Sequence, residues 1–394
     1  MQTLPRYVLA ELNKVFLVVL IALAMMMIIV GVVQEGTRQN LPLAQLINLI
    51  PYILPDALRY TLPVSLLLAT TTVYARMSGF NEVIAIKSLG ISPMAVLWPA
   101  FIMAFLLSLV TVCLNDVAVS WGRHGAQRVV SEAIEEIAYS MLRAQHAYST
   151  SRFAIYVKRV EGRRLISVRL SLEPSGKTPG IMITAEEAEL RSDPANNVLK
   201  IFLRNGTVRV EGKISYEFPD VDERDIPLRD AKEQAESSLP SWLPLSVIPD
   251  QITLNQKKIH HQRQEMAIRA ALDMVSGDLQ RLASPEWGYW NELLNGMQSK
   301  LFRLLTEPHR RWSAGFSCLF FVWVGAPMAI RLRNGDLLTS FFLCFLPILI
   351  VYYPLLVYGI DGSKHGTIPP CSVWAGNLLL FAWGTWLLRK VTRY

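Results

Sequence analysis

Cysteine is scarce in this 394-residue sequence, which contains only four. All four lie in or at the ends of long apolar runs, at Cys113, Cys318, Cys344 and Cys371. The polar middle of the chain has no cysteine, so disulfides cannot stabilise it. We therefore expect that region to fold around a hydrophobic core of its own.

The short motifs of common enzymes are also missing. The sequence contains no GxxxxGK[ST] phosphate loop, no HExxH, no CxxC and no GxSxG. His261 and Glu265 stand four residues apart on a predicted helix, but two ligands do not make a metal site, and a solvated helix face explains them. We expect a chain that is not an enzyme, with no cofactor, no metal and no nucleotide-binding site of its own.

Charge is absent from several long stretches, and 52% of all residues are hydrophobic. Uncharged runs cover residues 15–33, 88–115, 312–330, 337–360 and 367–388. Each is long enough to cross a membrane core of about 30 Å as a helix. A sixth, shorter run at residues 60–75 can be extended by the mostly apolar segment before it. No small-residue cleavage pattern follows Val33, so the first run predicts a retained span. The fold class is thus six transmembrane helices, three on each side of a polar insertion.

Basic residues predict how the chain is oriented. The short loops on the side of both termini hold nine Lys and Arg residues, and the opposite short loops hold three. The positive-inside rule places both termini in the cytoplasm and the polar insertion outside. The net charge of +7 favours contact with anionic lipid over nucleic acid, because no patch of interleaved basic and aromatic residues occurs.

The insertion at residues 115–311 is long enough to be a domain between the spans of residues 1–114 and 312–394. Helical spacing over residues 115–147 predicts a stalk. Apolar residues then alternate over residues 148–228, which predicts at least five short strands in a β-sandwich, jelly roll or open trough. Asn205-Gly206, between two strand-like runs, predicts a two-residue hairpin turn joining residues 197–203 to 207–218.

Helical periodicity returns at residues 253–306. One predicted face is apolar, with residues at alternating steps of four and three: Ile268, Leu272, Val275, Leu279 and Leu282. Such a face packs on something, most simply the β domain or a neighbouring subunit.

A short segment at residues 76–92 lies between the second and third runs, on the predicted cytoplasmic side. Ser78 or Asn81 can cap a helix start, Glu82 suits the first turn, and Gly90 suits the end. We therefore expect a helix of about two turns at about residues 78–90. It is either an amphipathic loop resting on lipid or a docking helix for a cytosolic partner.

Ionisable residues lie near the outer ends of the first two runs. Asp56 and Arg59 are one helical turn apart and either neutralise each other or serve transport. Arg38, just outside the first run, either contacts a phosphate or carboxylate on a lipid head group or anchors the helix at the interface.

Three stretches together resemble the LptF/LptG family of lipopolysaccharide-export permeases. The first is LPVSLLLATTTVYARMSGFNEVIAIKSLGIS at residues 62–92. The second combines His309-Arg310-Arg311, which opens the fourth run, with Gly325-Ala326-Pro327. The third combines Tyr352-Tyr353 with HGTIPP at residues 365–370 and Trp374-Ala375-Gly376-Asn377. The chain departs from the family pattern at about residues 230–305, where it has more helix.

The resemblance implies one half of an exporter in a bacterial inner membrane. A second six-span subunit, the same or a paralogue, would pair with this chain, and a cytosolic ATPase dimer would dock on both. The coupling helix would contain Glu82, Val83, Ile86, Leu89 and Gly90, with Glu82 contacting the ATPase. The β domain would be a jelly-roll trough that accepts the glycolipid and passes it to a periplasmic bridge protein, and Arg38 would lie near the lipid phosphates.

Two other functions remain open at the level of sequence. One is a different ABC permease with an extracytoplasmic domain, acting on lipoproteins or drugs. The other is a scaffold that anchors a β module outside the membrane without transport.

Overall fold

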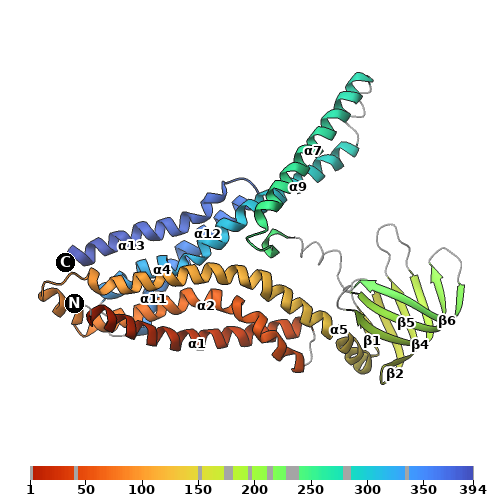
Figure 1. Cartoon of the computed structure of the whole chain (residues 1–394), viewed down its shortest axis with the longest axis horizontal. Helices are drawn as coiled ribbons and strands as arrows, with labels where there is room; N and C mark the ends of the chain where they lie inside the picture. Colours follow the sequence, from red (N-terminus) through yellow and green to blue (C-terminus); the bar gives the residue numbers. More distant parts are fainter. Residues whose placement is uncertain are drawn as a thin grey trace. The chain divides into compact units, whose positions relative to one another are not determined.

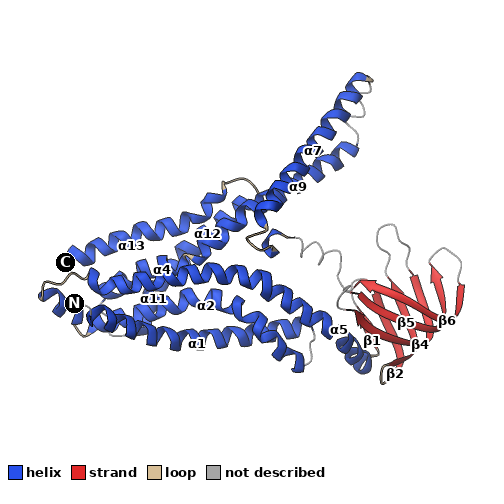
Figure 2. Cartoon of the chain, viewed as in Figure 1, coloured by secondary structure: helices blue, strands red, loops and turns tan. Residues whose placement is uncertain are grey.

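A computed structural model of the chain describes residues 3–39, 43–149, 153–172, 181–193, 198–210, 216–227, 239–277, 285–332 and 337–393. The chain divides into two compact units (Figure 1). One contains Met1–Ile29, Leu54–Gly122 and Leu239–Tyr394, and the other contains Val30–Ile53 and Arg123–Ser238. All described strands belong to the second unit, and the first unit is helical (Figure 2).

The first half of the chain forms long helices joined by short connections. They are α1 (Thr3–Gln39), α2 (Leu43–Gly79), α3 (Glu82–Ser88), α4 (Met94–Val117), the π-helical segment η1 (Ala118–Arg123) and α5 (His124–Gln145). Helix α4, η1 and α5 follow one another without a break, so the third apolar run continues as the predicted stalk helix.

The region after the sheet is also helical. It comprises η2 (Pro240–Trp242), α7 (Ile248–Val275), α9 (Pro285–Gly315), α10 (Ser317–Leu332), α11 (Leu337–Pro347), η3 (Ile348–Tyr352), α12 (Tyr353–Lys364), η4 (Pro370–Trp374) and α13 (Ala375–Arg393). Residues Leu239–Tyr394 group with the first apolar runs and not with the sheet.

Among the described residues, five helical segments are long and apolar enough to cross a membrane. They are Leu4–Thr37, Met94–Arg123, Trp287–Leu332, Thr339–Lys364 and Pro370–Arg393. Helix α2, the sixth predicted span, is not among them, so six spans stay a prediction. Its segment from Leu62 to Met77 nevertheless lies inside the helical unit, where Leu66, Ala69 and Tyr74 are fully buried.

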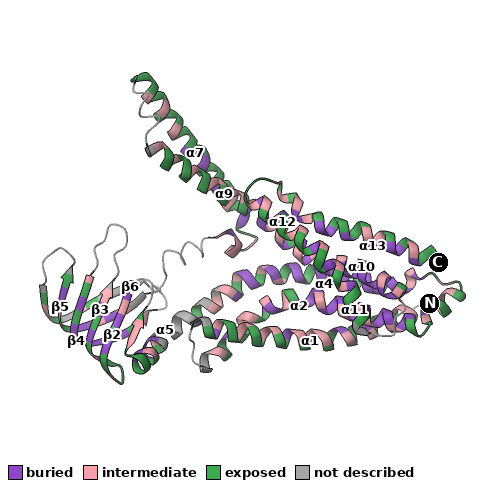
Figure 3. Cartoon of the chain, turned by 180° about the vertical axis from the view of Figure 1, so that it is seen from behind, coloured by how far each residue is buried: buried purple, intermediate pink, exposed green. Residues whose placement is uncertain are grey.

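The core of the helical unit joins residues from several helices (Figure 3). Val8 and Leu12 of α1 pack with residues of α2, α4, α10 and α13 in one buried cluster. Small residues let backbones approach closely, as membrane helices require. At Gly315 of α9, a Cβ atom would stand 3.0 Å from the Val112 backbone nitrogen of α4.

A buried ionic cluster joins α4, α9 and the η2 segment within the helical unit. The Arg311 side chain is 3% exposed, and its Nη1 atom lies 3.0 Å from Asp116 Oδ1. Arg311 Nη2 also donates to the carbonyl oxygen of Leu243, at 2.7 Å. Asp116 Oδ1 in turn accepts a hydrogen bond from the Leu245 backbone N–H, at 2.8 Å. Glu307 lies one turn before Arg311 and is itself 2% exposed.

The second unit contains a six-stranded antiparallel sheet. Its strands are β1 (Ala147–Ser149), β2 (Phe153–Glu161), β3 (Arg164–Leu172), β4 (Ile181–Asp193), β5 (Val198–Val210) and β6 (Tyr216–Pro227), and neighbouring strands follow chain order. A jelly roll would need connections that cross between strands. Among the described strands the connections are those of a meander, so the jelly-roll form is not confirmed.

One face of the sheet forms a hydrophobic core with α5. Ile155, Leu170, Ile183 and Leu203 are buried in a cluster that also contains residues of α5. Tyr139 of α5 is 6% exposed, and its hydroxyl accepts a hydrogen bond from the Leu190 backbone N–H, at 3.0 Å. Without cysteine, burial and strand pairing hold this unit together, as expected.

The predicted hairpin at Asn205-Gly206 is wrong. Strand β5 runs straight through both residues, and its pairing with β6 shifts register between Arg204 and Gly206. A type I′ turn needs positive φ at both central residues, but only Asn205 has it, at 48°. One left-handed residue makes a β-bulge instead of a chain reversal. Gly206 is needed because a Cβ there would lie 2.5 Å from the Thr184 carbonyl oxygen.

Within this chain, the described part of the apolar face predicted over residues 253–282 is exposed, so its packing on a neighbouring subunit stays a prediction. Helix α7 packs on α9 of its own unit through other positions: Asn255 Nδ2 donates to the Met297 carbonyl oxygen at 2.9 Å, and Ile259 is buried beside it. Ile268, Leu272 and Val275 are 61%, 63% and 87% exposed in this chain. Leu279 and Leu282 lie outside the described residues.

Replacing Arg311 tests the buried ionic cluster. Arg311→Met should lower the free energy of unfolding by about 3–5 kcal/mol, because the Asp116 carboxylate loses its buried cation and the loop loses its donors. Arg303→Met is the matched control, since Arg303 is exposed on the same helix. Thermal denaturation of both full-length variants in detergent measures the difference. Equal midpoints for the two variants would refute a stabilising role for the cluster.

Candidate functional site

The candidate site is α3, a seven-residue helix between α2 and α4. It occupies the predicted place but is shorter than residues 78–90. The predicted cap does not form: Asn81 stands at the N-cap with φ 60°, and within the described structure its side chain makes no capping hydrogen bond. Ser78 does not cap the helix either, because its hydroxyl donates to the Ile330 carbonyl oxygen of α10, at 2.7 Å.

The end of α3 follows the prediction for Gly90. Gly90 has φ 73°, its backbone N–H donates to the Lys87 carbonyl oxygen at 2.9 Å, and the Ile91 N–H donates to that of Ile86 at 3.3 Å. These two bonds form a Schellman motif, in which the residue after the C-cap is left-handed. Glycine adopts this conformation without steric cost.

Three contacts fasten α3 to the helical unit. Val83 is 3% exposed and belongs to the main buried cluster, against which Ile86 also packs. The Lys87 ammonium donates to the Val391 carbonyl oxygen at the end of α13, at 2.9 Å. The Lys87 bond attaches α3 to the last turns of α13, while Ser78, at the end of α2 just before α3, is bonded to the last turn of α10.

A different set of residues on and beside α3 faces away from the unit. Phe80 and Leu89 are 73% and 76% exposed, and Ile84 is 41% exposed. The predicted site therefore divides into two groups. Val83 and Ile86 anchor the helix, whereas Leu89 and Gly90 lie on the exposed side and Glu82 is half-buried. Phe80 and Ile84 complete the exposed apolar patch and are absent from the predicted set. Their apolar character was visible in the sequence, but the helix is too short to reveal which positions face inward.

An ionic chain lies beside the start of α3. Arg76 Nη2 lies 2.7 Å from Glu11 Oε1 of α1, and Lys14 lies 3.9 Å from the same carboxylate. The hydrogen bond to Glu11 raises the pKa of Arg76, and the negative charge of Glu82 acts in the same direction. Glu82 thus lies near enough to Arg76 to stabilise its positive charge.

Other sequence candidates lie elsewhere. Arg38 is in the last turn of α1, and its side chain lies outside the described residues. Arg59 is 9% exposed and lies 2.6 Å from Asp56, so the predicted pair forms. His261 and Glu265 lie 3.4 Å apart on an exposed helix face. Among the described residues, no group of three or more potential metal ligands occurs.

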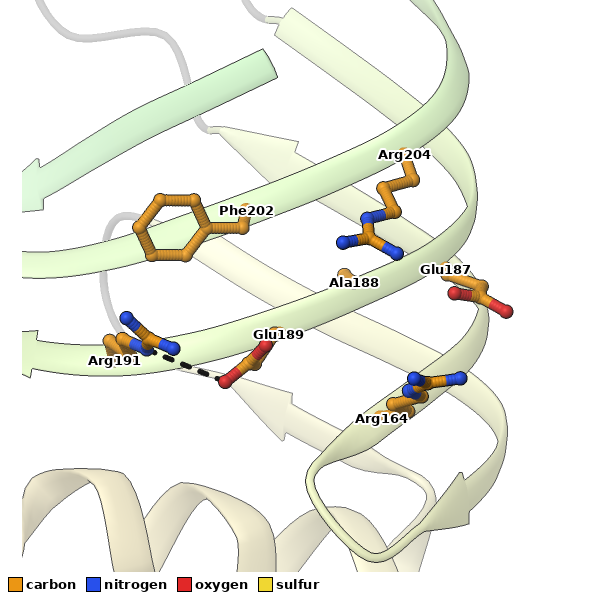
Figure 4. Close-up of a pocket in the computed structure, with 7 residues that line it drawn as sticks. All are labelled: Arg164, Glu187, Ala188, Glu189, Arg191, Phe202 and Arg204. Atoms are coloured by element: carbon orange, nitrogen blue, oxygen red, sulfur yellow. Dashed lines mark ion pairs between the residues drawn. The ribbon is translucent and has the colours of Figure 1, made fainter. Parts of the chain in front are cut away.

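The polar face of the sheet carries a second candidate, a cleft of about 270 Å³ (Figure 4). Arg164, Arg191 and Arg204 surround it together with Glu187 and Glu189, and Arg191 lies 3.4 Å from Glu189. Alternating charges across strands are typical of the solvated face of an antiparallel sheet. We therefore interpret this cleft as surface.

A comparison with family models bears on the functions left open by the sequence. The model described as "Lipopolysaccharide export system permease LptF/LptG" matches residues 6–390, nearly the whole chain. This chain belongs to the LptF/LptG family. It is therefore a membrane transport component of the lipopolysaccharide-export permease type and not itself an enzyme. A search of curated proteins found no match.

The Schellman motif at the end of α3 can be tested on the isolated LptF/LptG-family chain, without a partner protein. Gly90→Val should destabilise the end of the helix by about 1–2 kcal/mol, because a β-branched residue adopts a left-handed backbone with difficulty. Amide hydrogen exchange across residues 82–92 should then rise about tenfold. Gly90→Asn is the control, since asparagine tolerates positive φ. Unchanged exchange in the valine variant would contradict the Schellman assignment.

Proposed function

We propose that this chain is a permease subunit of an ABC-type exporter that extracts lipopolysaccharide or a similar glycolipid from the bacterial inner membrane. A separate cytosolic ATPase dimer supplies the energy by docking on α3. The observation that carries the proposal is the division of α3 into a buried, hydrogen-bonded side and an exposed apolar side. The buried side fixes α3 to the helical unit, and the exposed side offers a partner an apolar surface, so a force from the partner would be passed to the unit.

The missing phosphate loop supports this division of labour. A chain without a GxxxxGK[ST] sequence lacks this common ATP-binding motif, which fits energy supplied by contact with a separate ATPase. Phe80, Ile84 and Leu89 provide the apolar part of that contact, and Glu82 provides a negative charge at its edge. Burial of exposed apolar side chains contributes about 25 cal/mol per Å², so a patch of three large residues suits a docking site.

Sidedness is supported by contacts at one end of the helical unit. Glu11 near the start of the chain reaches Arg76, and Lys87 reaches Val391 near its end. Both chain ends and α3 therefore lie together, where the predicted cytoplasmic basic residues gather. We propose a multi-pass protein of the inner membrane with both termini in the cytoplasm and the sheet in the periplasm.

The sheet and the outer helix ends fit the transport route that the family implies. One face of the sheet is apolar, which fits a trough that accepts the lipid and passes it to a periplasmic bridge protein, and residues of α5 pack against part of that face. Arg38, at the outer end of α1, would meet the lipid phosphates. Only 11% of the apolar window in α1 is buried within this chain, which leaves this helix free to face a second six-span subunit.

Two alternatives are tested together with the proposal. The family match disfavours a lipoprotein or drug permease, and the fastening of α3 disfavours a scaffold without transport. Gentle purification of the tagged chain from its native host, followed by mass spectrometry of proteins and lipids, separates the three. We expect a cytosolic ATPase, a second permease chain and a glycolipid. Recovery of the chain without ATPase and glycolipid would favour the scaffold.

Charge reversal at Glu82 tests the docking surface directly. Glu82→Arg should reduce co-purification of the ATPase at least about tenfold, because a charge at the edge of the contact is replaced by its opposite. The chain should still fold, since Val83 and Lys87 keep α3 fastened. Glu265→Arg on α7 makes the same exchange at an exposed carboxylate outside the proposed surface, and it should leave ATPase recovery unchanged. Normal recovery with Glu82→Arg would remove Glu82 from the interface.

A further inference from the structure

A crease crosses the sheet at one row of residues, which runs over four strands: Lys158 of β2, Ser167 of β3, Glu186 of β4 and Asn205 of β5. In the described sheet, strand pairing is interrupted at this crease row, although the register is the same on both sides of it. Ser167 and Asn205 have positive φ angles of 53° and 48°. Few residues other than glycine adopt this conformation, and those that do are concentrated at functional sites. The crease is therefore a candidate binding site.

The crease changes which residues of a strand face the core. In β4, Ala185 and Ala188 both belong to the buried core of the sheet, and in β3 Leu165 and Val168 do. Each pair is three residues apart, whereas strict alternation along a strand would give an even spacing. Two consecutive residues of these strands therefore face outward at the crease, among them the exposed Glu186. The crease divides the outer, polar face of the sheet into two halves.

A cleft of about 650 Å³, the crease cleft, lies on one of these halves and includes the crease row. It is also lined by a second row, whose members stand opposite one another on consecutive strands: Tyr156, Arg169, Thr184 and Thr207. Neighbouring strands are about 4.8 Å apart, so each row is about 14 Å long. Small-molecule sites have volumes of about 300–1,000 Å³, so the crease cleft is large enough for one. The charged cleft with Glu187 and Glu189 lies on the other half (Figure 4).

The polar groups of the crease cleft are of the kinds that bind sugar hydroxyls. The hydroxyls of Ser167, Thr184 and Thr207 can each donate and accept a hydrogen bond. The Asn205 Nδ2 atom donates to Glu186 Oε2, at 3.2 Å, and this bond orients both side chains. A sugar hydroxyl is itself both a donor and an acceptor, so it is suited to this mixture of groups.

Tyr156 supplies an apolar surface on which a sugar ring can lie. Its side chain is 50% exposed, and tyrosine combines an apolar ring with a polar hydroxyl. Val157 and Val168 also line the cleft, but they are only 6% and 3% exposed, so an acyl chain would find little apolar surface. The Glu186 carboxylate lies among the basic residues of the cleft, which disfavours a ligand that is only an anion.

We propose that the crease cleft binds a saccharide, with a sugar ring on Tyr156 and its hydroxyls on Glu186 and Asn205. The inference rests on the export of a glycolipid proposed above, because the saccharide would be the head group of that cargo. The opposite face of the sheet is apolar. The two faces of the sheet therefore match the two chemistries of a glycolipid.

Saturation-transfer NMR measures this binding on the full chain in detergent. The probe is the lipid-free oligosaccharide released from the glycolipid of the native host, with its phosphate groups removed. Saturation of the protein methyl groups passes to bound sugar protons, and a titration gives the affinity. We expect transfer to the sugar-ring protons, and an equal concentration of inorganic phosphate should not displace the oligosaccharide. Displacement by phosphate would overturn the proposal in favour of an anion site.

Variants on both halves of the outer face assign the binding to the crease cleft. Glu186→Ala should weaken it about fivefold, the effect of one lost hydrogen bond. Glu189→Ala, on the same strand beyond the crease, should leave it unchanged. Asn205→Gly should weaken binding as Glu186→Ala does while keeping the fold, because glycine adopts a positive φ without steric cost. Equal affinities for all three variants would overturn the proposal in favour of unspecific binding.

Two exposed tyrosines give a second comparison. Tyr156→Ala should weaken binding, whereas Tyr289→Ala, which removes a 63% exposed tyrosine from α9 of the helical unit, should not. Absence of saturation transfer with the wild-type chain would overturn the saccharide site. Recovery of glycolipid with that same chain would then leave the proposed export standing, so failure of the site and failure of the proposed function are distinguishable.

Discussion

The attachment of α3 to the helical unit is the constraint on which the proposed function depends. A seven-residue helix is too short to be stable by itself, because nucleation is costly and few intrahelical bonds follow it. Tertiary contacts therefore determine its position. Val83 supplies burial, while the bonds from Ser78 and Lys87 reach main-chain carbonyl oxygens of α10 and α13. Both acceptors lie near helix ends, where carbonyl groups lack intrahelical partners, so the same bonds satisfy the long helices and hold the short one.

The Arg311 cluster solves a related problem at another point of the helical unit. After the sheet, the chain returns to the helical unit through the η2 segment, whose backbone groups need partners when buried. Arg311 donates to the carbonyl oxygens of Ser241 and Leu243, and Asp116 accepts from the Leu245 N–H. The Arg311–Asp116 pair therefore supplies the hydrogen-bond partners that the irregular backbone around residues 241–245 needs. This explains why the Arg311 charge is buried where an apolar residue would cost less desolvation.

Apolar run length and strand alternation were sufficient to predict most of the architecture. Helices α1 and α5, the β-rich region and the later helices occur at the residues where the sequence predicts helix or strand, and α3 lies at its predicted place. The errors lie where a local signal has two solutions. Asn-Gly favours a hairpin, but a single left-handed residue also suits a bulge, and the long pairing of β4 with β5 selects the bulge. On α3, Val83 and Leu89 are equally apolar. Only the packing of the helical unit shows that Val83 faces inward and Leu89 outward.

The two ends of α3 differ in how they can transmit motion. At its start, Arg76 is tied to Glu11, so α2 and α1 are joined by an ion pair whose side chains are 39% and 21% exposed. At its end, Gly90 and the turn before Met94 carry the chain directly into α4. A force on the patch of Phe80, Ile84 and Leu89 therefore reaches α10 and α13 through hydrogen bonds to the main chain, and α4 through the covalent chain. The covalent path from α3 to α4 passes through the turn at Gly90, and α4 then continues through η1 into α5.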